Sequence, residues 1–561
     1  MKRRVLASVL FSLAAAACSG DSFNNSGDFV TDAGAGGLPE CLSSNECPTG
    51  FTCTEFGTCV QPPPGGADAG LGVEVEIELS PPTHSERFVY VAMSELDALA
   101  KIDGQTLEVE SIAVGDQPEV LAAIPGGDGV VVLDQNNATA TIVRPLASGD
   151  DTRTVPTLAN LNRISVDPSG SFALAWFDLQ KATQEAGGLE AVGEIGSFQD
   201  VTVIRLAQDN EHAVNLTVGF RPRAIEFDSA GTRAFVVSDD GISVIPLADV
   251  VATGPHIVAP IPLGGEGSGS ASTQEVTIVS TGEFALVREN GLAEIRVVRL
   301  SGAETGEVST IVLSAPATDV DLSKDGTKAY AVLRDTSELA IVDMSQGLPG
   351  QAQMQVVEFP DTAFGSMVLS PQDEEIVLYT NASSEESIVV VSLTDSYSAR
   401  TVRLKKSIRS VGYDPTGKSL IVTHAKSAGD PRQSGIDFDE FIDRSYGYSI
   451  IDLETGFAKL QITSVDTGAF QFSGSSPRAY VLLDGSEEGN GESLTHIINL
   501  ETGIVKERVM SSPPETVGIL PVAGVAFVNQ THALGRVSFI NVDTDAMRTV
   551  TGFDLNSRVV D

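Results

Sequence analysis

The sequence is short of positive charge. It has 35 lysine and arginine residues against 76 aspartate and glutamate residues, which gives a formal net charge of -41. Such a chain is repelled by nucleic-acid phosphates and by anionic lipid surfaces. The densest basic cluster has the pattern of a solvated strand edge, and its members are Arg403, Lys405, Lys406 and Arg409. We therefore expect no nucleic-acid partner.

Motifs of common enzyme classes are also missing. The chain has no G-x-S-x-G, no H-E-x-x-H, no P-loop and no C-x-x-C-H, so the sequence gives no catalytic residue. The six histidines are scattered. His424, which ends an expected strand, fits a packed or surface residue better than a ligand. The single tryptophan, Trp176, is expected to pack between structural units.

Long hydrophobic runs are absent apart from one at the N-terminus. Three basic residues at positions 2–4 precede an uncharged run over 5–17, which is shorter than the roughly 20 residues of a membrane-spanning helix. This pattern predicts a cleaved export signal over 1–17. Ala15-Ala16-Ala17-Cys18 resembles the lipobox of bacterial lipoproteins, although Ala15 stands where that family usually has leucine. An ordinary signal with an incidental Cys18 is the alternative.

The resemblance implies a lipid on Cys18. Ser19 follows that cysteine in place of aspartate, which by the same resemblance favours the outer membrane. Residues 19–86 carry 11 acidic residues and no lysine or arginine, so they should repel one another and extend. We expect a disordered lipid-anchored tether over 18–40 and a linker rich in Pro, Gly and acidic residues over 61–86.

Cysteine is scarce, and it is confined to the N-terminal part. Apart from Cys18 there are four, with five residues between neighbours: Cys41, Cys47, Cys53 and Cys59. In an exported chain this predicts a two-disulfide module over 41–60, with three pairings open. A zinc site is the alternative, but its usual C-x2-4-C spacing and a histidine are missing. The stretch resembles small Cys-rich modules of secreted proteins from predatory soil bacteria (myxobacteria).

From residue 87 onward, turns rich in Asp and Gly alternate with short apolar strands. A turn followed by an apolar strand recurs ten times, with central strand positions at Tyr90, Val131, Leu174, Phe235, Leu286, Tyr330, Val377, Ile421, Tyr480 and Phe527. Units of about 40–50 residues with four antiparallel strands are typical of β-propeller blades. We predict an all-β propeller over 87–561, as one large ring of about ten blades. Two smaller rings are the alternative.

The ends of the chain suggest how the ring closes. The segment 557–560 matches the strand before each repeat and could complete the first blade, which the chain enters near Arg87. The strand-like segment 73–79 could join an outer edge. Fragments such as AVGDQPEVLAAIPGGDGVVVL and SIIDLETG resemble the YVTN-type (YncE-like, WD40-like) propeller family. That resemblance implies the fold; the family includes surface proteins, binding modules and unrelated enzymes.

Three insertions lengthen the repeats, and two of them are candidates for function. The segment 179–200 could form a short helix over one face. The segment 424–448 holds four carboxylates within seven residues, and these are candidate Ca²⁺ ligands: Asp437, Asp439, Glu440 and Asp443. The order of an EF-hand is missing, so a solvated acidic loop or helix cap is the competing interpretation.

Two functions follow from these features. The first is a cell-envelope scaffold, without enzymatic activity, that binds an envelope or extracellular protein or a small ligand. The second is a propeller enzyme, such as a lactonase-like hydrolase or a dehydrogenase, with its site on the central channel. Catalytic residues drawn from different blades would leave no linear motif, so the lining of the channel discriminates between the two.

Overall fold

The structure is a computed structural model. It describes residues 83–553, apart from 194, 251–253, 255, 265–273, 361, 486–491 and 533, and two short strands nearer the N-terminus. Those strands, β1 (Thr52–Cys53) and β2 (Cys59–Val60), pair antiparallel with Cys53 opposite Cys59. They belong to a unit of residues 10–72 that is separate from the rest. The predictions for Cys18, Cys41, Cys47, the tether and the linker lie outside the described residues.

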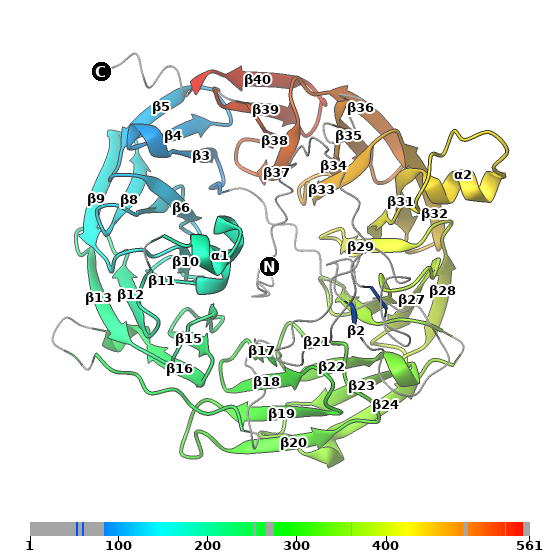
Figure 1. Cartoon of the computed structure of the whole chain (residues 1–561), viewed down its shortest axis with the longest axis horizontal. Helices are drawn as coiled ribbons and strands as arrows, with labels where there is room; N and C mark the ends of the chain where they lie inside the picture. Colours follow the sequence, from blue (N-terminus) through cyan, green and yellow to red (C-terminus); the bar gives the residue numbers. More distant parts are fainter. Residues whose placement is uncertain are drawn as a thin grey trace, which may run out of the picture. The chain divides into compact units, whose positions relative to one another are not determined.

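Ten antiparallel sheets follow one another along the chain and stand around a central axis (Figure 1). Within each sheet the strands pair in chain order, and the first described strand lies nearest the axis (Figure 1). The structure therefore confirms a single propeller of ten blades. The alternative of two smaller rings is wrong.

The first five blades run from β3 to β20. Blade 1 has β3 (Phe88–Met93), β4 (Ala98–Asp103) and β5 (Val109–Ala113); blade 2 has β6 (Pro118–Ala123), β7 (Val130–Asp134), β8 (Thr139–Leu146) and β9 (Gly149–Pro156); blade 3 has β10 (Arg163–Val166), β11 (Phe172–Trp176), β12 (Asp200–Arg205) and β13 (His212–Thr217); blade 4 has β14 (Ala224–Phe227), β15 (Arg233–Ser238) and β16 (Gly241–Pro246); blade 5 has β17 (Gln274–Ile278), β18 (Phe284–Glu289), β19 (Glu294–Arg299) and β20 (Val308–Val312).

The other five blades run from β21 to β40. Blade 6 has β21 (Asp319–Leu322), β22 (Lys328–Leu333), β23 (Glu338–Asp343) and β24 (Met354–Glu358); blade 7 has β25 (Ser366–Leu369), β26 (Glu375–Tyr379), β27 (Ser387–Ser392) and β28 (Ala399–Arg403); blade 8 has β29 (Ile408–Tyr413), β30 (Ser419–His424), β31 (Tyr446–Asp452) and β32 (Phe457–Thr463); blade 9 has β33 (Asp466–Phe472), β34 (Arg478–Asp484), β35 (Ser493–Asn499) and β36 (Ile504–Val509); blade 10 has β37 (Pro514–Leu520), β38 (Val525–Gln530), β39 (Arg536–Asn541) and β40 (Met547–Thr551).

Helices occur only in connections of the described chain. Two are α-helical, α1 (Leu179–Ala186) and α2 (Phe438–Arg444), and five are short 3₁₀ turns: η2 (Ser94–Leu96), η3 (Leu189–Ala191), η4 (Leu247–Asp249), η6 (Arg334–Thr336) and η7 (Gln351–Gln353). No helix of the described segments has the length and apolar character needed to cross a membrane.

The core is divided among the blade interfaces. Ten buried hydrophobic clusters each combine side chains from two neighbouring blades, one cluster per interface. The second strand of a blade is covered on both faces, so β7 is buried at every position, whereas the outer strand β20 keeps only one residue buried. Since burying one aliphatic side chain contributes about 1.5–3 kcal/mol, stacking stabilises blades that could not cover both faces alone.

The recurring turn residues have a common task. Asp167 is fully buried at the end of β10, where its carboxylate accepts hydrogen bonds from Ser169 N (2.8 Å) and Phe172 N (2.6 Å). Asp228 accepts from Thr232 N at 2.7 Å in the same place of blade 4. These bonds close the hairpin between the first two strands, which explains why Asp and Gly mark each repeat.

Blades 1 and 4 depart from four described strands. In blade 4 the place of the outer strand is taken by the segment 256–261, which bridges Ile242 through Ile261 and also reaches Thr217 of blade 3 through Ile257. Pro260 lies within this segment and lacks an amide hydrogen, so a regular ladder cannot form. In blade 1 the described part of the inner strand is a single bridge between His84 and Val89.

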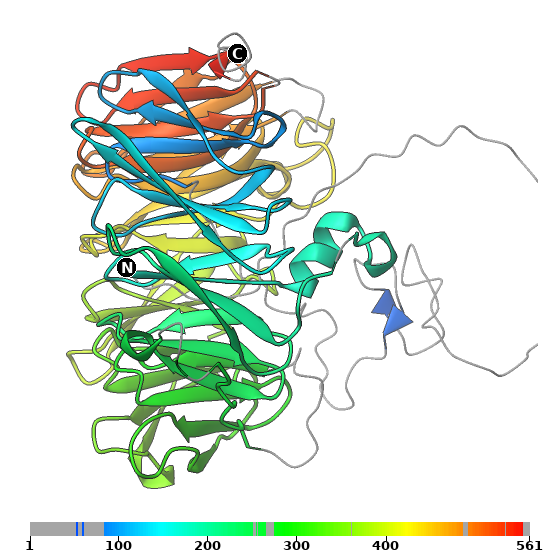
Figure 2. The same cartoon turned by 90° about the vertical axis from the view of Figure 1, so that its left-hand side faces the viewer.

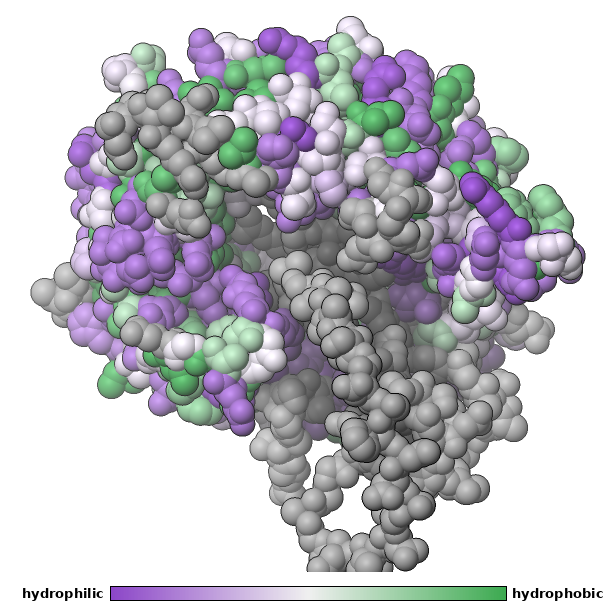
Figure 3. All heavy atoms as spheres, turned by 45° about the horizontal axis from the view of Figure 1, so that its top comes forward, coloured by the Kyte–Doolittle hydropathy of each residue, from purple (hydrophilic) through white to green (hydrophobic). Residues whose placement is uncertain are grey.

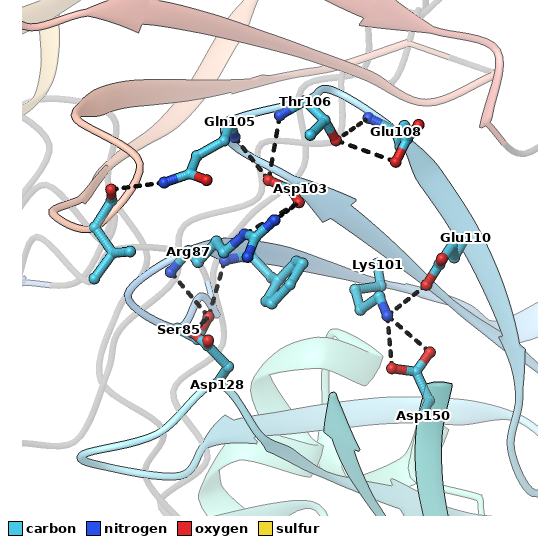
Figure 4. Close-up of polar contacts among 12 residues, drawn as sticks. Ser85, Arg87, Lys101, Asp103, Gln105, Thr106, Glu108, Glu110, Asp128 and Asp150 are labelled. Atoms are coloured by element: carbon cyan, nitrogen blue, oxygen red, sulfur yellow. Dashed lines mark hydrogen bonds and ion pairs between the residues drawn. The ribbon is translucent and has the colours of Figure 1, made fainter. Parts of the chain in front are cut away.

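Blades 1 and 10 meet and close the ring (Figure 1, blue beside red). Gln105 Nε2 donates to the carbonyl of Val522 at 3.0 Å, and Val522 N donates to Glu86 O at 3.1 Å. The Gln105 turn is itself held by Asp103, which accepts from Gln105 N at 2.7 Å and pairs with Arg87 (Figure 4). The predicted contribution of 557–560 to this closure lies outside the described residues, as does the segment 73–79.

Candidate functional site

The two helical insertions emerge from the same face of the ring. Each joins the second strand of its blade to the third: α1 joins β11 to β12, and α2 joins β30 to β31. Because all inner strands run in one direction, all such connections leave on one face, which we call the insertion face. Figure 2 shows α1 projecting from it. The insertions belong to blades 3 and 8 of ten, so they stand on opposite sides of the ring.

A network of polar groups fixes α1. Asp178 caps the helix, with its Oδ1 accepting from Gln180 N (2.9 Å) and Lys181 N (3.2 Å), and its Oδ2 accepting from Arg163 Nε at 3.1 Å. Asn162 exchanges two hydrogen bonds with the backbone of Asp178, at 2.7 and 2.9 Å. Lys181 Nζ donates to Asn162 O at 2.7 Å. The predicted short helix over one face is therefore present and held to the start of β10.

A buried lysine holds α2. Lys406 is 1% exposed, and its Nζ donates to the carbonyls of Ile442 (2.6 Å) and Asp443 (2.9 Å) at the C-terminal end of the helix. Burial lowers the pKa of Lys406, while the charges of Asp443 and Glu386 oppose that shift. The negative end of the helix dipole favours a cation at this position. Lys406 is thus an anchor within the fold and not part of a basic surface.

The other basic residues near Lys406 do not form a patch with it. Arg409 points its Nη1 at Asp466 Oδ1 of the next blade, at 3.0 Å. Arg403 is exposed at the end of β28 in blade 7, and Lys405 is exposed in the turn that follows it. The prediction of a solvated strand edge fits Arg403 and Lys405, but it is wrong for Lys406, which is buried beneath α2.

The four candidate calcium ligands lie along α2. Asp437 caps the helix by accepting from Glu440 N at 2.8 Å, and the carboxylate of Glu440 pairs with Arg444. The backbone of Asp443 accepts from Lys406, and Asp439 is exposed in the first turn. Across the described parts of the chain, no group of three or more His, Cys, Asp or Glu side chains is placed to hold a metal ion. Calcium binding here stays a prediction.

The α2 insertion carries an exposed aromatic ring. Phe438 is 72% exposed, and its ring stacks on that of Phe441 with centroids 6.3 Å apart. The insertion reaches beyond the rim of the ring (Figure 1, yellow). On the face shown in Figure 3, hydrophobic and hydrophilic residues alternate over the described surface. Aromatic side chains on a fixed projection are typical anchors of protein–protein contacts.

Acidic side chains of the inner strands bind the neighbouring blade. Asp319 of β21 accepts from Met367 N of β25 at 2.7 Å. Glu226 of β14 accepts from Ile278 N of β17 at 3.4 Å, and burial raises the pKa of Glu226 to about 8. A carboxyl with such a pKa can exchange a proton near neutral pH. Glu226 is thus a partly exposed inner-strand carboxyl with a raised pKa, in contact with the next blade.

The histidine and tryptophan predictions can be placed directly. His424 is 1% exposed; its Nδ1 lies 3.1 Å from Ser407 O and its Nε2 lies 2.7 Å from Ser449 Oγ. Burial lowers the pKa of His424 to about 4, so it is packed and neutral. Trp176 packs in the cluster between blades 3 and 4, as predicted.

One groove was not foreseen from the sequence. It lies between the outer strands of blades 8 and 9, and its volume is about 380 Å³. We call it the rim groove, and its walls include Lys459, Gln461, Thr463, Leu494, His496 and Glu507. These residues come from β32, β35 and β36, so no linear motif unites them. The available signal was His496, a titratable residue inside a strand.

Comparisons with known proteins give similarities at low identity. No family model matches the sequence, and no curated protein sequence matches it. Hydrazine synthase of Kuenenia stuttgartiensis is similar at 13% identity and a TM-score of 0.33, over 59% of this chain and 95% of that one. A eukaryotic initiation factor is similar at 10% identity and a TM-score of 0.46, over 76% and 96%. The WD40 domain of Toxoplasma gondii coronin is similar at 12% identity and a TM-score of 0.31, over 48% and 67%.

Proposed function

We propose that this protein is a binding scaffold of the bacterial cell envelope. In this proposal it is exported, tethered to the outer membrane through a lipid on Cys18, and presents the insertion face to an envelope or extracellular partner. The observation that carries the proposal is the placement of α1 and α2 on one face at opposite sides of a ten-bladed ring. Both insertions are fixed by buried polar contacts, so the face is pre-organised for binding.

The N-terminal sequence supports the envelope location. The basic start, the short apolar run and the small residues before Cys18 are typical of a lipoprotein signal, and the four further cysteines suit an oxidising compartment. The fragments that resemble the YVTN-type family agree with a surface or binding role. The partner class is an envelope or extracellular protein, with a small ligand as the other option.

Site-specific photo-crosslinking in intact cells tests this proposal. A photoreactive phenylalanine analogue replaces Phe438 on the insertion face or, as a control, Leu146, which is 44% exposed in the β8–β9 hairpin at the opposite face. We expect discrete crosslinked products from position 438 and none from position 146. Equal products from both positions, or none from position 438, would contradict the role of the insertion face.

Glu226 favours a second function, a propeller enzyme of the lactonase-like or dehydrogenase type. Its carboxyl lies on an inner strand, and a pKa of about 8 suits a general acid or base at neutral pH. Turnover of a lactone or quinone-linked substrate by the full chain, lost in Glu226→Gln with the fold intact, would support the enzyme. The same assay on Asp319→Asn reports the effect of loosening a blade contact alone.

A further inference from the structure

The rim groove has two defined walls. Along β32, Lys459, Gln461 and Thr463 are alternate residues, so they share one face of blade 8. The facing wall belongs to blade 9, where His496 pairs with Glu507 across β35 and β36. Both walls are formed by strands of the rigid ring, which makes the groove a fixed feature and not a gap between loops.

Hydrogen bonds border the groove at both ends. At one end Lys459 Nζ donates to Gly503 O of blade 9 at 2.7 Å. At the other end Ser464 Oγ donates to Glu492 Oε2 at 2.6 Å. Between blades 1 and 2, in contrast, Lys101 reaches across to Asp150 at 2.6 Å and fills the space between the walls (Figure 4). The rim groove is therefore a space between two blades that is closed by a hydrogen bond at each end.

The polar groups of the groove have a defined charge. The Tyr448 hydroxyl lies 2.9 Å from His496 Nδ1, and His496 Nε2 lies 3.7 Å from Glu507 Oε2. Burial lowers the pKa of His496, which favours the neutral ring. Glu507 is 58% exposed, whereas the ammonium of Lys459 is held by Gly503 O at the border. The groove thus holds one cation, the Lys459 ammonium at its border, and one anion, the more exposed carboxylate of Glu507.

The strand beside the groove has a free edge. Within the described residues β32 pairs with β31 alone, and its seven residues contain no proline. A free strand edge presents amide and carbonyl groups that can pair with an added strand. In such an added strand, alternate side chains would point to the same side, and that side is the groove.

We propose that the rim groove and the edge of β32 form a binding site for an extended polypeptide segment. The segment adds to blade 8 as a fifth strand, and an arginine or lysine side chain enters the groove and pairs with Glu507. The net charge of -41 also favours a cationic segment. This site is distinct from the insertion face and does not depend on the function proposed for it.

Selection from a phage-displayed library of random heptapeptides on the full chain tests the site. We expect enriched sequences in which arginine or lysine alternates with β-branched or aromatic residues. Synthetic copies should bind the full chain, and copies methylated at alternate backbone nitrogens should not, because they cannot pair with a strand. Gln461→Trp, which fills the groove, should weaken binding at least about tenfold, and Glu507→Gln should weaken it about three- to fivefold, as for a partly exposed ion pair.

Matched variants on other outer strands serve as controls. Glu358→Gln on β24 and Thr401→Trp on β28 should bind the peptides as the unmodified chain does. Thermal melts followed by circular dichroism check that each variant folds. If Gln461→Trp does not fold, the binding results for Glu507→Gln and for the methylated peptides test the proposal. Absence of enrichment, or equal binding by Glu507→Gln and by methylated peptides, overturns the proposal. The crosslinking result at position 438 is independent of all these outcomes.

Discussion

At the scale of single residues, two buried side chains beneath the α2 insertion set how firmly it is held. Lys406 ties the last turn of α2 to the base of blade 8, and His424 fills the adjoining space with both ring nitrogens hydrogen-bonded. Both groups are removed from water, so each influences the stability of the fold more than a surface lysine or histidine would.

Lys406→Met keeps the length of the side chain but removes both hydrogen bonds to the α2 carbonyls. We expect local destabilisation of about 1–3 kcal/mol, because two buried carbonyls lose their donor. Hydrogen exchange should become faster in α2 (Phe438–Arg444) with little change in the blade cores. Lys405→Met, at the exposed neighbouring position, is the control, and equal acceleration in both variants would contradict an anchoring role.

His424 makes stability depend on pH. Below pH 6.5 the unfolded chain binds a proton at this residue, while the folded chain, with a pKa of about 4, does not. Stability therefore falls as the pH drops from 6.5 to 4, by about 3 kcal/mol for this residue. His424→Gln should lose less stability over that interval in urea titrations. His212→Gln, at a partly exposed site, should follow the unmodified chain.

At the scale of elements, each blade interface depends on close backbone approach at a few positions. A Cβ on Gly104 would lie 2.5 Å from Leu520 Cδ1 and 2.9 Å from Ala523 Cβ, across the junction of blades 1 and 10. Gly104→Ala should destabilise the fold by about 1–3 kcal/mol, as overpacking does elsewhere. Gly127→Ala, where no atom lies within 4 Å, is the control. Equal urea midpoints for the two variants would show that the junction of blades 1 and 10 accommodates the added methyl group, against this prediction.

Strands could be predicted from the sequence where each repeat uses the same turn residues to join them. The hairpin that Asp167 and Asp228 close has the same turn residues in most blades, so ten repeats were visible in the sequence. The outer strand of blade 4 was harder to predict, because an irregular segment that contains Pro260 takes its place. The rim groove could not be predicted, since Tyr448, His496 and Glu507 meet only once blades 8 and 9 have packed.

In the α2 insertion, acidic residues that are close in the sequence do not form one site in space. Asp437 and Glu440 are close along the chain, but one caps the helix and the other pairs with Arg444. A capping residue three positions before a glutamate is a helix-start signal, and that signal competes with the interpretation as a metal loop.

At the scale of the whole molecule, the proposal joins a membrane anchor to the propeller. Cys18→Ala should remove the lipid attachment, so the exported protein should move from the membrane pellet to the soluble fraction after cell fractionation. Metabolic labelling with a palmitate analogue should be lost at the same time. Cys41→Ala, which leaves the lipobox intact, should keep the protein in the membrane pellet. Release of both variants would contradict attachment through Cys18.

Ring closure also dictates an order of folding. The bond between Gln105 and Val522 joins residues 417 positions apart, and closing so long a loop costs about 5 kcal/mol of chain entropy. Synthesis delivers the N-terminal end first, so blade 1 keeps one apolar face uncovered until blade 10 has been made. Until then this face is open to aggregation, and a chaperone of the compartment in which the chain folds would find its binding surface there.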